Sequence, residues 1–280
     1  MIVSFHPCFV GDANHICAGR PPGDTDLAAI RAADAVVLPQ GCSRQLFDMA
    51  RANCRHVFPD YETKFRYPGK IGQTRLFRKL RVQHPKTVTF ETCEAFFSRC
   101  PDWQKHPPLA YPLVFKLDWG GEGEAVTLIR SSDDLSAALD HAHRCELSGQ
   151  NGFLLQNFIP GQSRTLRITV IGTRFISYWR VQPDGGRFIV NLADGGIVDH
   201  DSDPDLQQVA KTTVRDFCRK TGINLAGFDM LFSPDGTPLF LEINYFFGRR
   251  GLGGSERYYE LLVAEIHRWI ETTGLTPPGV

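Results

Sequence analysis

The sequence has no long apolar segment and no excess of charge of either sign, and each absence excludes a class of protein. No apolar run approaches the roughly 20 residues that a membrane-spanning helix needs. Lys and Arg total 31, and Asp and Glu also total 31. No overall electrostatic field therefore attracts nucleic acid or an anionic membrane. We expect neither a membrane nor a nucleic acid as a partner.

The eight cysteines form no Cys-x-x-Cys pair, so their spacing predicts neither a zinc site nor a thioredoxin-like motif. The opening residues, MIVSFHPCFVGD, lack the basic region and the long apolar core of a secretory signal peptide. From both observations we expect a cytoplasmic protein with reduced thiols.

What the chain does contain is typical of a globular protein with two or three domains. It has 280 residues, of which 42% are hydrophobic and 22% are charged. Two short apolar runs, at 2–5 and 35–39, flank a helical pattern and predict a small β-α-β unit. The basic stretch at 61–81 is typical of a solvated helix face.

The remaining segments predict a compact α+β module followed by strands and two long helices. After the segment PKTVTF at 85–90, strands are expected at 113–117, 126–129, 166–171, 175–181, 226–233 and 239–244. A Gly-rich hairpin is expected between the first two of these strands, and a hairpin turn at Gly172 and Thr173 between the next two. Helices are expected at 131–142, from Pro204 to a stop at Gly222, and after Ser255.

An acidic pair stands out in the segment 227–244. The turn sequence at 234–237 folds the chain about the Asp235–Gly236 bond, which sets Asp229 opposite Glu242. With a period of two, Glu242 and Asn244 share one face, while Leu239, Leu241 and Ile243 take the other. The three oxygen-bearing side chains suit Mg²⁺ beside substrate phosphates. Solvated acids on an edge strand, or salt bridges to arginines, are the alternatives.

A second element points to phosphate. Lys116 lies within the apolar strand LVFKL, directly before a loop with glycines at 120, 121 and 123. Glycines let backbone N–H groups approach phosphate oxygens. The loop is not a Walker motif, because no Gly-Lys-Ser/Thr follows and a strand comes next.

The order of these motifs resembles the ATP-grasp superfamily, in particular bacterial glutathione synthetase and the ligases that add glutamate to a ribosomal protein. The resemblance extends from Lys70 to Ile270. It is carried by Lys70, Lys116 with its Gly loop, LLQNFIPG, TLRITVIG, NLADGG, GFDMLF and LEIN. It implies an α+β ATP-grasp fold in three parts: a short N-terminal β-α-β unit at 1–69, a linker helix and lid at 70–155, and a catalytic subdomain at 156–280.

The resemblance also implies roles for individual residues. Those expected to bind ATP are Lys70, Lys116, Gly120, Gly121, Gly123, Gln156, Asn157, Phe158 and Ile159. Those expected to hold Mg²⁺, or alternatively Mn²⁺, are Asp229, Glu242 and Asn244. Those expected near the transferring phosphate are Arg167, Arg180 and Asn191, with Gly195 and Gly196. The sequence departs from the family at Thr165, where relatives commonly have Asp, and at Ile189, where glutathione synthetase has an arginine.

The implied reaction is ATP-dependent ligation of a small-molecule carboxylate to an amine, or to a thiol, through an acyl phosphate. A peptide acceptor and a homo-oligomer stay open. Arg249 and Arg250 lie in a Gly-rich loop just beyond Asn244, where their paired charges suit a substrate carboxylate. A solvent-exposed turn is the alternative for these two arginines. For the whole chain, the alternatives are a small-molecule kinase and a regulatory module that binds ATP without turnover.

Overall fold

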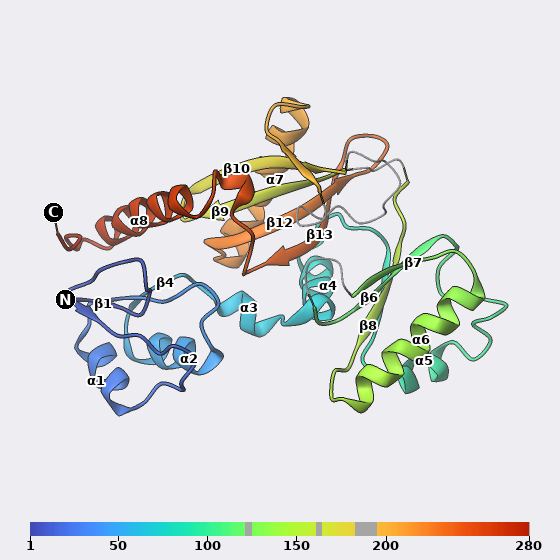
Figure 1. Cartoon of the computed structure of the whole chain (residues 1–280), viewed down its shortest axis with the longest axis horizontal. Coiled ribbons are helices and arrows are strands. Elements are labelled where there is room, and N and C mark those ends of the chain that lie inside the picture. The colour runs from blue at the N-terminus through green and yellow to red at the C-terminus, as the bar shows by residue number, and fades with distance from the viewer. Residues whose placement is uncertain (121–124, 161–163, 183–194, 280) are drawn as a thin grey trace.

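The chain folds into three sheets with flanking helices, an α+β architecture (Figure 1). The computed structural model describes residues 1–120, 125–160, 164–182 and 195–279. Within these ranges no helix combines the length and apolarity that crossing a membrane requires.

The N-terminal sheet is parallel and larger than the expected β-α-β unit. Its order is β2 (Ala13–Asn14), β1 (Ile2–Ser4), β3 (Ala35–Val37) and β4 (His56–Phe58). Two helices connect these strands, α1 (Asp24–Ala32) and α2 (Arg44–Asn53). The sequence does not predict β2 or β4, because they hold only one and two apolar residues, fewer than the runs at 2–5 and 35–39 that contain β1 and β3.

The lid sheet is antiparallel and follows two short helices, α3 (Glu62–Arg66) and α4 (Gly69–Leu80). Its order is β5 (Thr87–Phe90), β8 (Phe153–Asn157), β6 (Leu113–Leu117) and β7 (Val126–Ile129). Helices α5 (Cys93–Arg99) and α6 (Ser132–Leu147) pack on one side of it. The expected hairpin around the Gly-rich loop is confirmed by the pairing of β6 with β7.

The central sheet is antiparallel. Its order is β11 (Ile197–Asp199), β10 (Arg174–Val181), β9 (Arg164–Ile171), β12 (Leu225–Phe232) and β13 (Pro238–Asn244). Helix α7 (Pro204–Thr221) covers one face, while η1 (Arg250–Leu252) and α8 (Ser255–Thr272) follow β13. The expected hairpin through Gly172 and Thr173 is confirmed.

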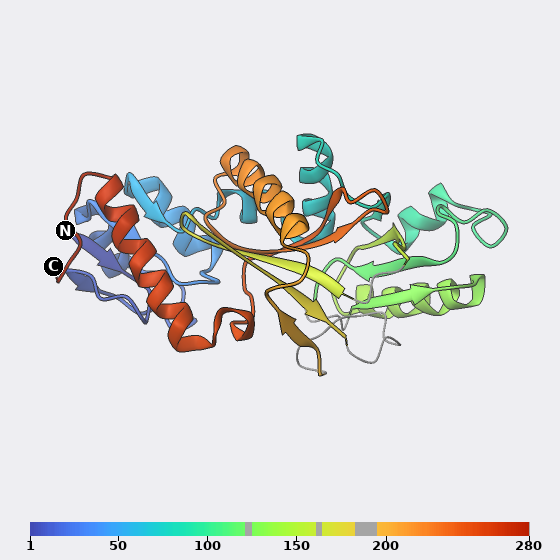
Figure 2. The same cartoon turned by 90° about the horizontal axis from the view of Figure 1, so that it is seen from above.

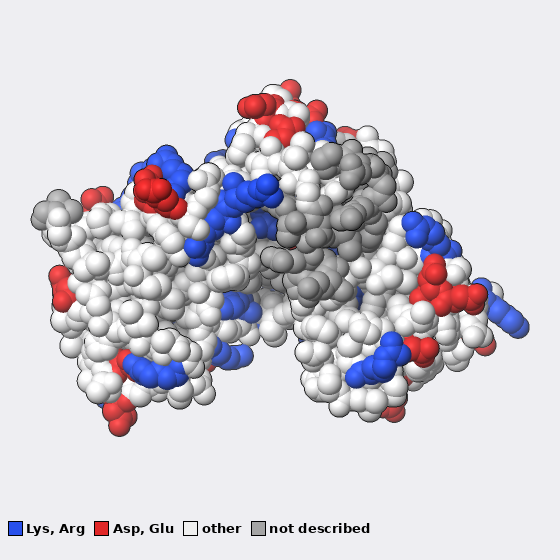
Figure 3. Space-filling view, in the orientation of Figure 1, with Lys and Arg blue, Asp and Glu red and all other residues white. Residues whose placement is uncertain are grey.

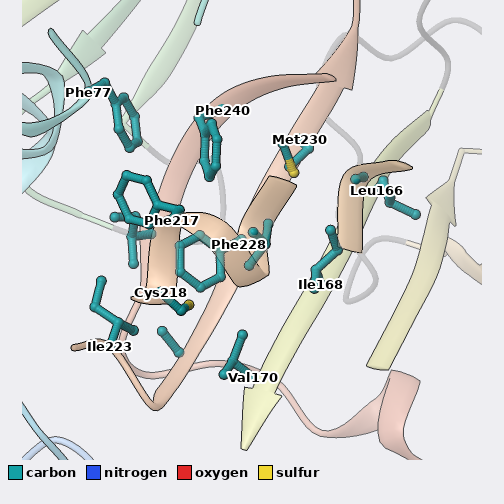
Figure 4. Close-up of a cluster of buried hydrophobic side chains, with 14 of the residues drawn as sticks. Phe77, Leu166, Ile168, Val170, Phe217, Cys218, Ile223, Phe228, Met230 and Phe240 are labelled. Atoms are coloured by element: carbon teal, nitrogen blue, oxygen red, sulfur yellow. The ribbon is translucent and has the colours of Figure 1, made fainter. Parts of the chain in front are cut away.

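The core beneath α7 comes from every second residue of the strands. Leu166, Ile168 and Val170 of β9 point into it, as Phe228 and Met230 of β12 do. Figure 4 shows their side chains gathered with those of Phe77, Phe217 and Phe240. Because strand side chains alternate, the residues between them must lie on the opposite face of the sheet.

The prediction that Leu239 and Leu241 share a face with Ile243 is wrong for the part of β13 nearer the turn. Asp229 does pair with Glu242 as expected, but the next pair is Met230 with Phe240, so Leu241 is an extra residue in a β-bulge. Phe240 and Ile243 therefore both reach the core, and Leu239 and Leu241 do not join it. The bulge lets β13 bury Phe240 while it keeps Glu242 on the other face.

Helix α8 ties the end of the chain to its beginning. Its apolar residues share one core with Ile2 and Phe58 of the N-terminal sheet and with Ile171 and Leu225 of the central sheet. Figure 2 shows α8, in red, lying across the blue N-terminal strands. Residues on both sides of the boundary predicted at residue 69 therefore pack in the same hydrophobic core.

The outer edge of β13 is covered at Ile243 by a glutamine side chain of α4, while the Phe240 N–H donates to the Gln83 carbonyl at 2.9 Å. Gln73 Nε2 donates to the carbonyl of Ile243 at 2.8 Å, and the Ile243 N–H donates to Gln73 Oε1 at 2.7 Å. The side-chain amide thus imitates a neighbouring strand, and all of these atoms are buried. The pair fixes α4, and with it Lys70, against the strand that carries Glu242.

We predict that Gln73→Leu lowers the free energy of unfolding by about 2 to 4 kcal/mol, because it leaves one buried N–H and one buried C=O without partners. Denaturant unfolding measures this loss. The matched control is Arg75→Ala on the same helix, which removes only an exposed ion pair with Glu91 and should cost less than about 1 kcal/mol. Equal losses in the two variants would contradict the role of Gln73.

Candidate active site

The face of the central sheet opposite α7 carries the charged residues. Arg167 lies between two core residues of β9, Arg180 follows Trp179 on β10, and Asp229 follows Phe228 on β12. Strand alternation brings the three together, since β9 pairs with both β10 and β12. Arg167 and Asp229 are directly opposite in the register.

The Asp229 carboxylate accepts four contacts. Arg167 Nε lies 2.6 Å from Oδ1 and Arg167 Nη2 lies 3.0 Å from Oδ2, a bidentate pair. Arg180 Nη2 lies 2.7 Å from Oδ1, and Asn244 Nδ2 donates to Oδ2 at 3.0 Å. Arg180 also donates to Thr165 Oγ1 at 2.9 and 3.2 Å, so the residue that departs from the family pattern holds this arginine.

Burial and charge compete at this cluster. Burial alone would raise the pKa of Asp229, but the charges of Arg167 and Arg180 outweigh it and hold the pKa below its ordinary value. Burial works against the charge of Arg167 too, yet Asp229 raises the pKa of that guanidinium. Asp229 and Arg167 therefore keep their charges although Asp229 is only 7% exposed, whereas burial lowers the pKa of Arg180 in spite of the neighbouring Asp229.

Lys70 and Glu242 form a second ionic pair beside the first. Lys70 Nζ lies 3.6 Å from Glu242 Oε1 and donates to the carbonyl of Gly120 at 2.9 Å. Lys70 is 7% exposed, so it does not belong to the solvated face that the rest of its basic stretch presents. It joins the first residues of the Gly-rich loop to the acidic pair.

Phe115 and Leu117 point to the face of the lid sheet that packs against α5 and α6, and Lys116 points to the other face. Burial, together with the charge of Lys70, lowers its pKa to about 8, although Glu242 and Asp229 oppose the shift. Lys116 therefore carries a proton that is less firmly held than that of an ordinary lysine.

The region where the central sheet, α4 and the lid sheet meet has more positive than negative charge in the part of the chain that the structure describes. Four cationic side chains, those of Lys70, Lys116, Arg167 and Arg180, meet two carboxylates, those of Asp229 and Glu242. Figure 3 shows a hollow between the lid and the rest of the molecule, with Lys and Arg atoms on its wall. Such a surface suits a polyanion rather than a neutral ligand.

Asp118 is a positioning residue that sequence reasoning missed. It follows β6, and its Oδ1 accepts the Ile71 N–H at 2.7 Å, while its carbonyl accepts the Lys70 N–H at 3.3 Å. Gly69 makes this contact possible, because its φ is +66° and a Cβ there would lie 2.3 Å from Asp118 Oδ2. The lid strand that carries Lys116 thus fixes the start of the helix that carries Lys70. An Asp after an apolar strand gives no sequence signal for such a contact.

The residues expected beside adenine lie at the end of β8 and just after it. Gln156 is buried and donates to Thr87 Oγ1 at 3.0 Å, and the N–H of Asn157 donates to the Lys86 carbonyl at 2.8 Å. Phe158 and Ile159 are half-buried. Of the other expected residues, Gly120 has a φ of +83°, and Gly121, Gly123 and Asn191 lie outside the described residues.

The structure separates the two arginines beyond β13. Arg249 lies with its guanidinium carbon 4.7 Å from the Tyr258 ring centre and 4.4 Å from that of Tyr259. Arg250 is exposed at the start of η1. The ring centre of His6 lies 6.2 Å from that of Tyr259, which places the loop after β1 beside Arg249. Burial, with the charge of Arg249, lowers the pKa of His6 to about 4.

Residues 72–270 match the family model of the RimK-like ATP-grasp domain. The chain belongs to this family. The match covers most of the chain and includes both the acidic pair and the two arginines of the central sheet. It confirms the resemblance drawn from the ordered motifs.

Other RimK-like and ATP-grasp proteins share sequence or fold with the chain. Beta-citrylglutamate synthase B of Danio rerio is 32% identical over 139 residues, which are 49% of this chain and 32% of that protein. The chain therefore spans about a third of that relative's length. A RimK domain ATP-grasp protein of Sphaerobacter thermophilus has a TM-score of 0.60 at 15% identity, covering 94% of this chain and 98% of the other. The D-Ala:D-Ser ligase VanG of Enterococcus faecalis has a TM-score of 0.63 at 16% identity, covering 85% and 73%.

We predict that the affinity for Mg-ATP is constant below pH 8 and falls by up to about tenfold per pH unit above it. The reason is that Lys116, with a pKa near 8, loses the charge that attracts phosphate, and bound phosphate would raise that pKa. Calorimetric titrations from pH 7 to pH 9 measure the effect. Lys116→Gln should bind weakly and without this slope. An unchanged slope in the variant would assign the titration to another group.

Proposed function

We propose that the chain is an ATP-dependent ligase that joins a carboxylate to an amine and releases ADP and phosphate. The observation that carries this proposal is the cluster of four cations and two carboxylates where the central sheet, α4 and the lid sheet meet, in a chain of the RimK-like ATP-grasp family. The names of relatives support it, since they include a citrylglutamate synthase and a D-Ala:D-Ser ligase. We also propose a cytoplasmic location, where ATP and the eight free thiols coexist.

The donor set fits a hard cation such as Mg²⁺ or Mn²⁺, because Asp229, Glu242 and Asn244 offer oxygen ligands on paired strands. Bound there, the metal would neutralise charge on the triphosphate. Both oxygens of Asp229 already accept two contacts each, so Asp229 can take part only if Asn244 or one of the arginines withdraws. Of the two arginines, Arg180 is the candidate, because it makes one contact with Asp229 where Arg167 makes two.

Each charged side chain of the cluster then has its own role in the reaction. Lys70 and Lys116 hold the phosphates, and Arg167 keeps Asp229 oriented. Arg180, once it has left Asp229, faces the phosphoryl group that is being transferred and stabilises the charge on its oxygens. The substrate carboxylate attacks the γ-phosphorus, which gives an acyl phosphate and ADP, and the amine then displaces phosphate. Gln156, Asn157, Phe158 and Ile159 would line the adenine side.

The loops after β1 and β3 converge on Arg249 and suggest where the acceptor lies. Tyr258 OH donates to Gln40 Oε1 at 3.0 Å, and Gln40 Nε2 donates to the Tyr245 carbonyl at 3.3 Å. In the order β2-β1-β3-β4, the carboxyl ends of β1 and β3 lie where the order reverses, a usual ligand position in parallel sheets. A guanidinium at this place suits a substrate carboxylate.

We expect Glu242→Gln to reduce ADP release by at least about a hundredfold while the fold persists, because the variant keeps the volume of Glu242 and removes its charge. Coupled assays of ADP release measure this rate, and circular dichroism checks the fold. Glu260→Gln, which alters an exposed acid on α8, is the control and should leave the rate unchanged. Turnover at the wild-type rate in Glu242→Gln would refute the assignment.

Hydroxylamine separates ligation from other uses of ATP. With a carboxylate substrate found by screening ADP release against amino acids and small peptides, an acyl phosphate yields a hydroxamate. A kinase acting on an alcohol would release ADP without hydroxamate, and a regulatory module would release no ADP. Either result would replace the proposed reaction.

Arg249→Ala should raise KM for the acceptor by roughly tenfold or more and leave KM for ATP within about twofold, because it removes an interaction with one substrate only. Steady-state kinetics with each substrate varied in turn give both constants. Arg250→Ala is the matched comparison from the same loop. If both variants keep the wild-type acceptor KM, the two arginines have no role in acceptor binding.

A further inference from the structure

The side of the lid sheet away from Lys116 carries a group of metal-binding side chains that the proposed reaction does not use. Cys93, the first residue of α5, lies beside His143 and Glu146 on the last turns of α6. One ligand atom from each residue lies within 4.8 Å of the other two. Phe115 and Leu117 share the core that contains Cys93, so the cluster and Lys116 lie on opposite faces of the sheet.

We propose that Cys93, His143 and Glu146 bind a divalent transition metal of the zinc type, which clamps α5 to α6. A thiol, an imidazole and a carboxylate are the three ligand types that zinc takes in proteins. Hard cations such as Mg²⁺ prefer oxygen ligands only, so this donor set also differs in kind from that of the central sheet.

The carboxylate is already oriented for this task. Glu146 Oε1 accepts the backbone N–H of Cys93 at 2.6 Å, and its Oε2 lies 4.0 Å from His143 Nδ1. One oxygen is thus fixed by the protein, and the other faces the imidazole, as in metal sites whose ligands are held by neighbouring hydrogen bonds. His143 and Glu146 are three residues apart on the helix, so they share a face.

The charges balance once a metal is present. A thiolate and a carboxylate carry two negative charges, and a neutral imidazole adds none, so the sum matches one divalent cation. The metal binds a thiolate, whereas an ordinary cysteine is a protonated thiol at neutral pH. Binding therefore forms a metal–sulfur bond and releases the thiol proton to solvent.

Access is one-sided. Cys93 is 3% exposed and Glu146 is half-buried, whereas His143 is exposed. A metal can therefore enter from solvent at His143 and leave a fourth position for water, an arrangement known for three-ligand zinc sites. The exposed histidine also gives a variant that should not disturb the core.

The test uses Co²⁺ as a spectroscopic probe on the full chain in saturating Mg²⁺, which occupies oxygen-only sites. We expect one equivalent of Co²⁺ to give a thiolate charge-transfer band and the visible bands of tetrahedral coordination, with release of about one proton. Zn²⁺ should displace Co²⁺ and raise the melting temperature. Absence of the thiolate band in the wild-type chain overturns the proposal.

Variants assign the ligands. Cys93→Ser should lose the thiolate band, and His143→Ala should weaken Co²⁺ binding by about tenfold or more and abolish the shift in melting temperature. His141→Ala and Cys145→Ser alter the neighbouring pair on α6 and should keep the band. Loss of the band in Cys145→Ser but not in Cys93→Ser would refute the assignment, and so would unweakened binding in His143→Ala.

Discussion

One buried carboxylate joins four strands of the central sheet. Asp229 on β12 accepts hydrogen bonds from Arg167 on β9, Arg180 on β10 and Asn244 on β13. A buried charge is costly unless it is paired and fully hydrogen-bonded, and here every oxygen of the carboxylate has partners. The contacts that offset the cost of burying the Asp229 charge also set the spacing of the cations around it. Thr165 completes the arrangement by holding Arg180 from the neighbouring strand.

Helix α4 connects this face to the lid. Gln73 fixes the helix to β13, and Asp118 fixes its first turn to the end of β6. Lys70 lies between these two attachments and reaches both Glu242 and the carbonyl of Gly120. A displacement of the lid would therefore change the position of Lys70 as well as that of Lys116. The two lysines would therefore move together, although they are 46 positions apart in the sequence.

Local sequence signals predicted the hairpins, the helix α7 from Pro204 to its stop at Gly222 and the pairing of Asp229 with Glu242, because turn residues and strand periodicity act over a few positions. They did not predict what depends on distant contacts. A glutamine in a helix gives no sign that it will cover a strand edge, and β2 and β4 hold too few apolar residues to form a recognisable run. The cluster of Cys93 with His143 and Glu146 escaped notice for the same reason, since about 50 residues lie between the cysteine and its neighbours.

The bulge at Leu241 also limits how the length of β13 can vary. Phe240 must point into the core and Glu242 away from it, although regular alternation would give both the same direction. Loss of Leu241 alone would restore regular alternation and still leave Glu242 opposite Asp229. Loss or gain of one residue between Glu242 and Asn244 would turn Asn244 toward the core. Loss of the bulge residue thus keeps Asp229, Glu242 and Asn244 on one face of the sheet, whereas a one-residue change between Glu242 and Asn244 does not.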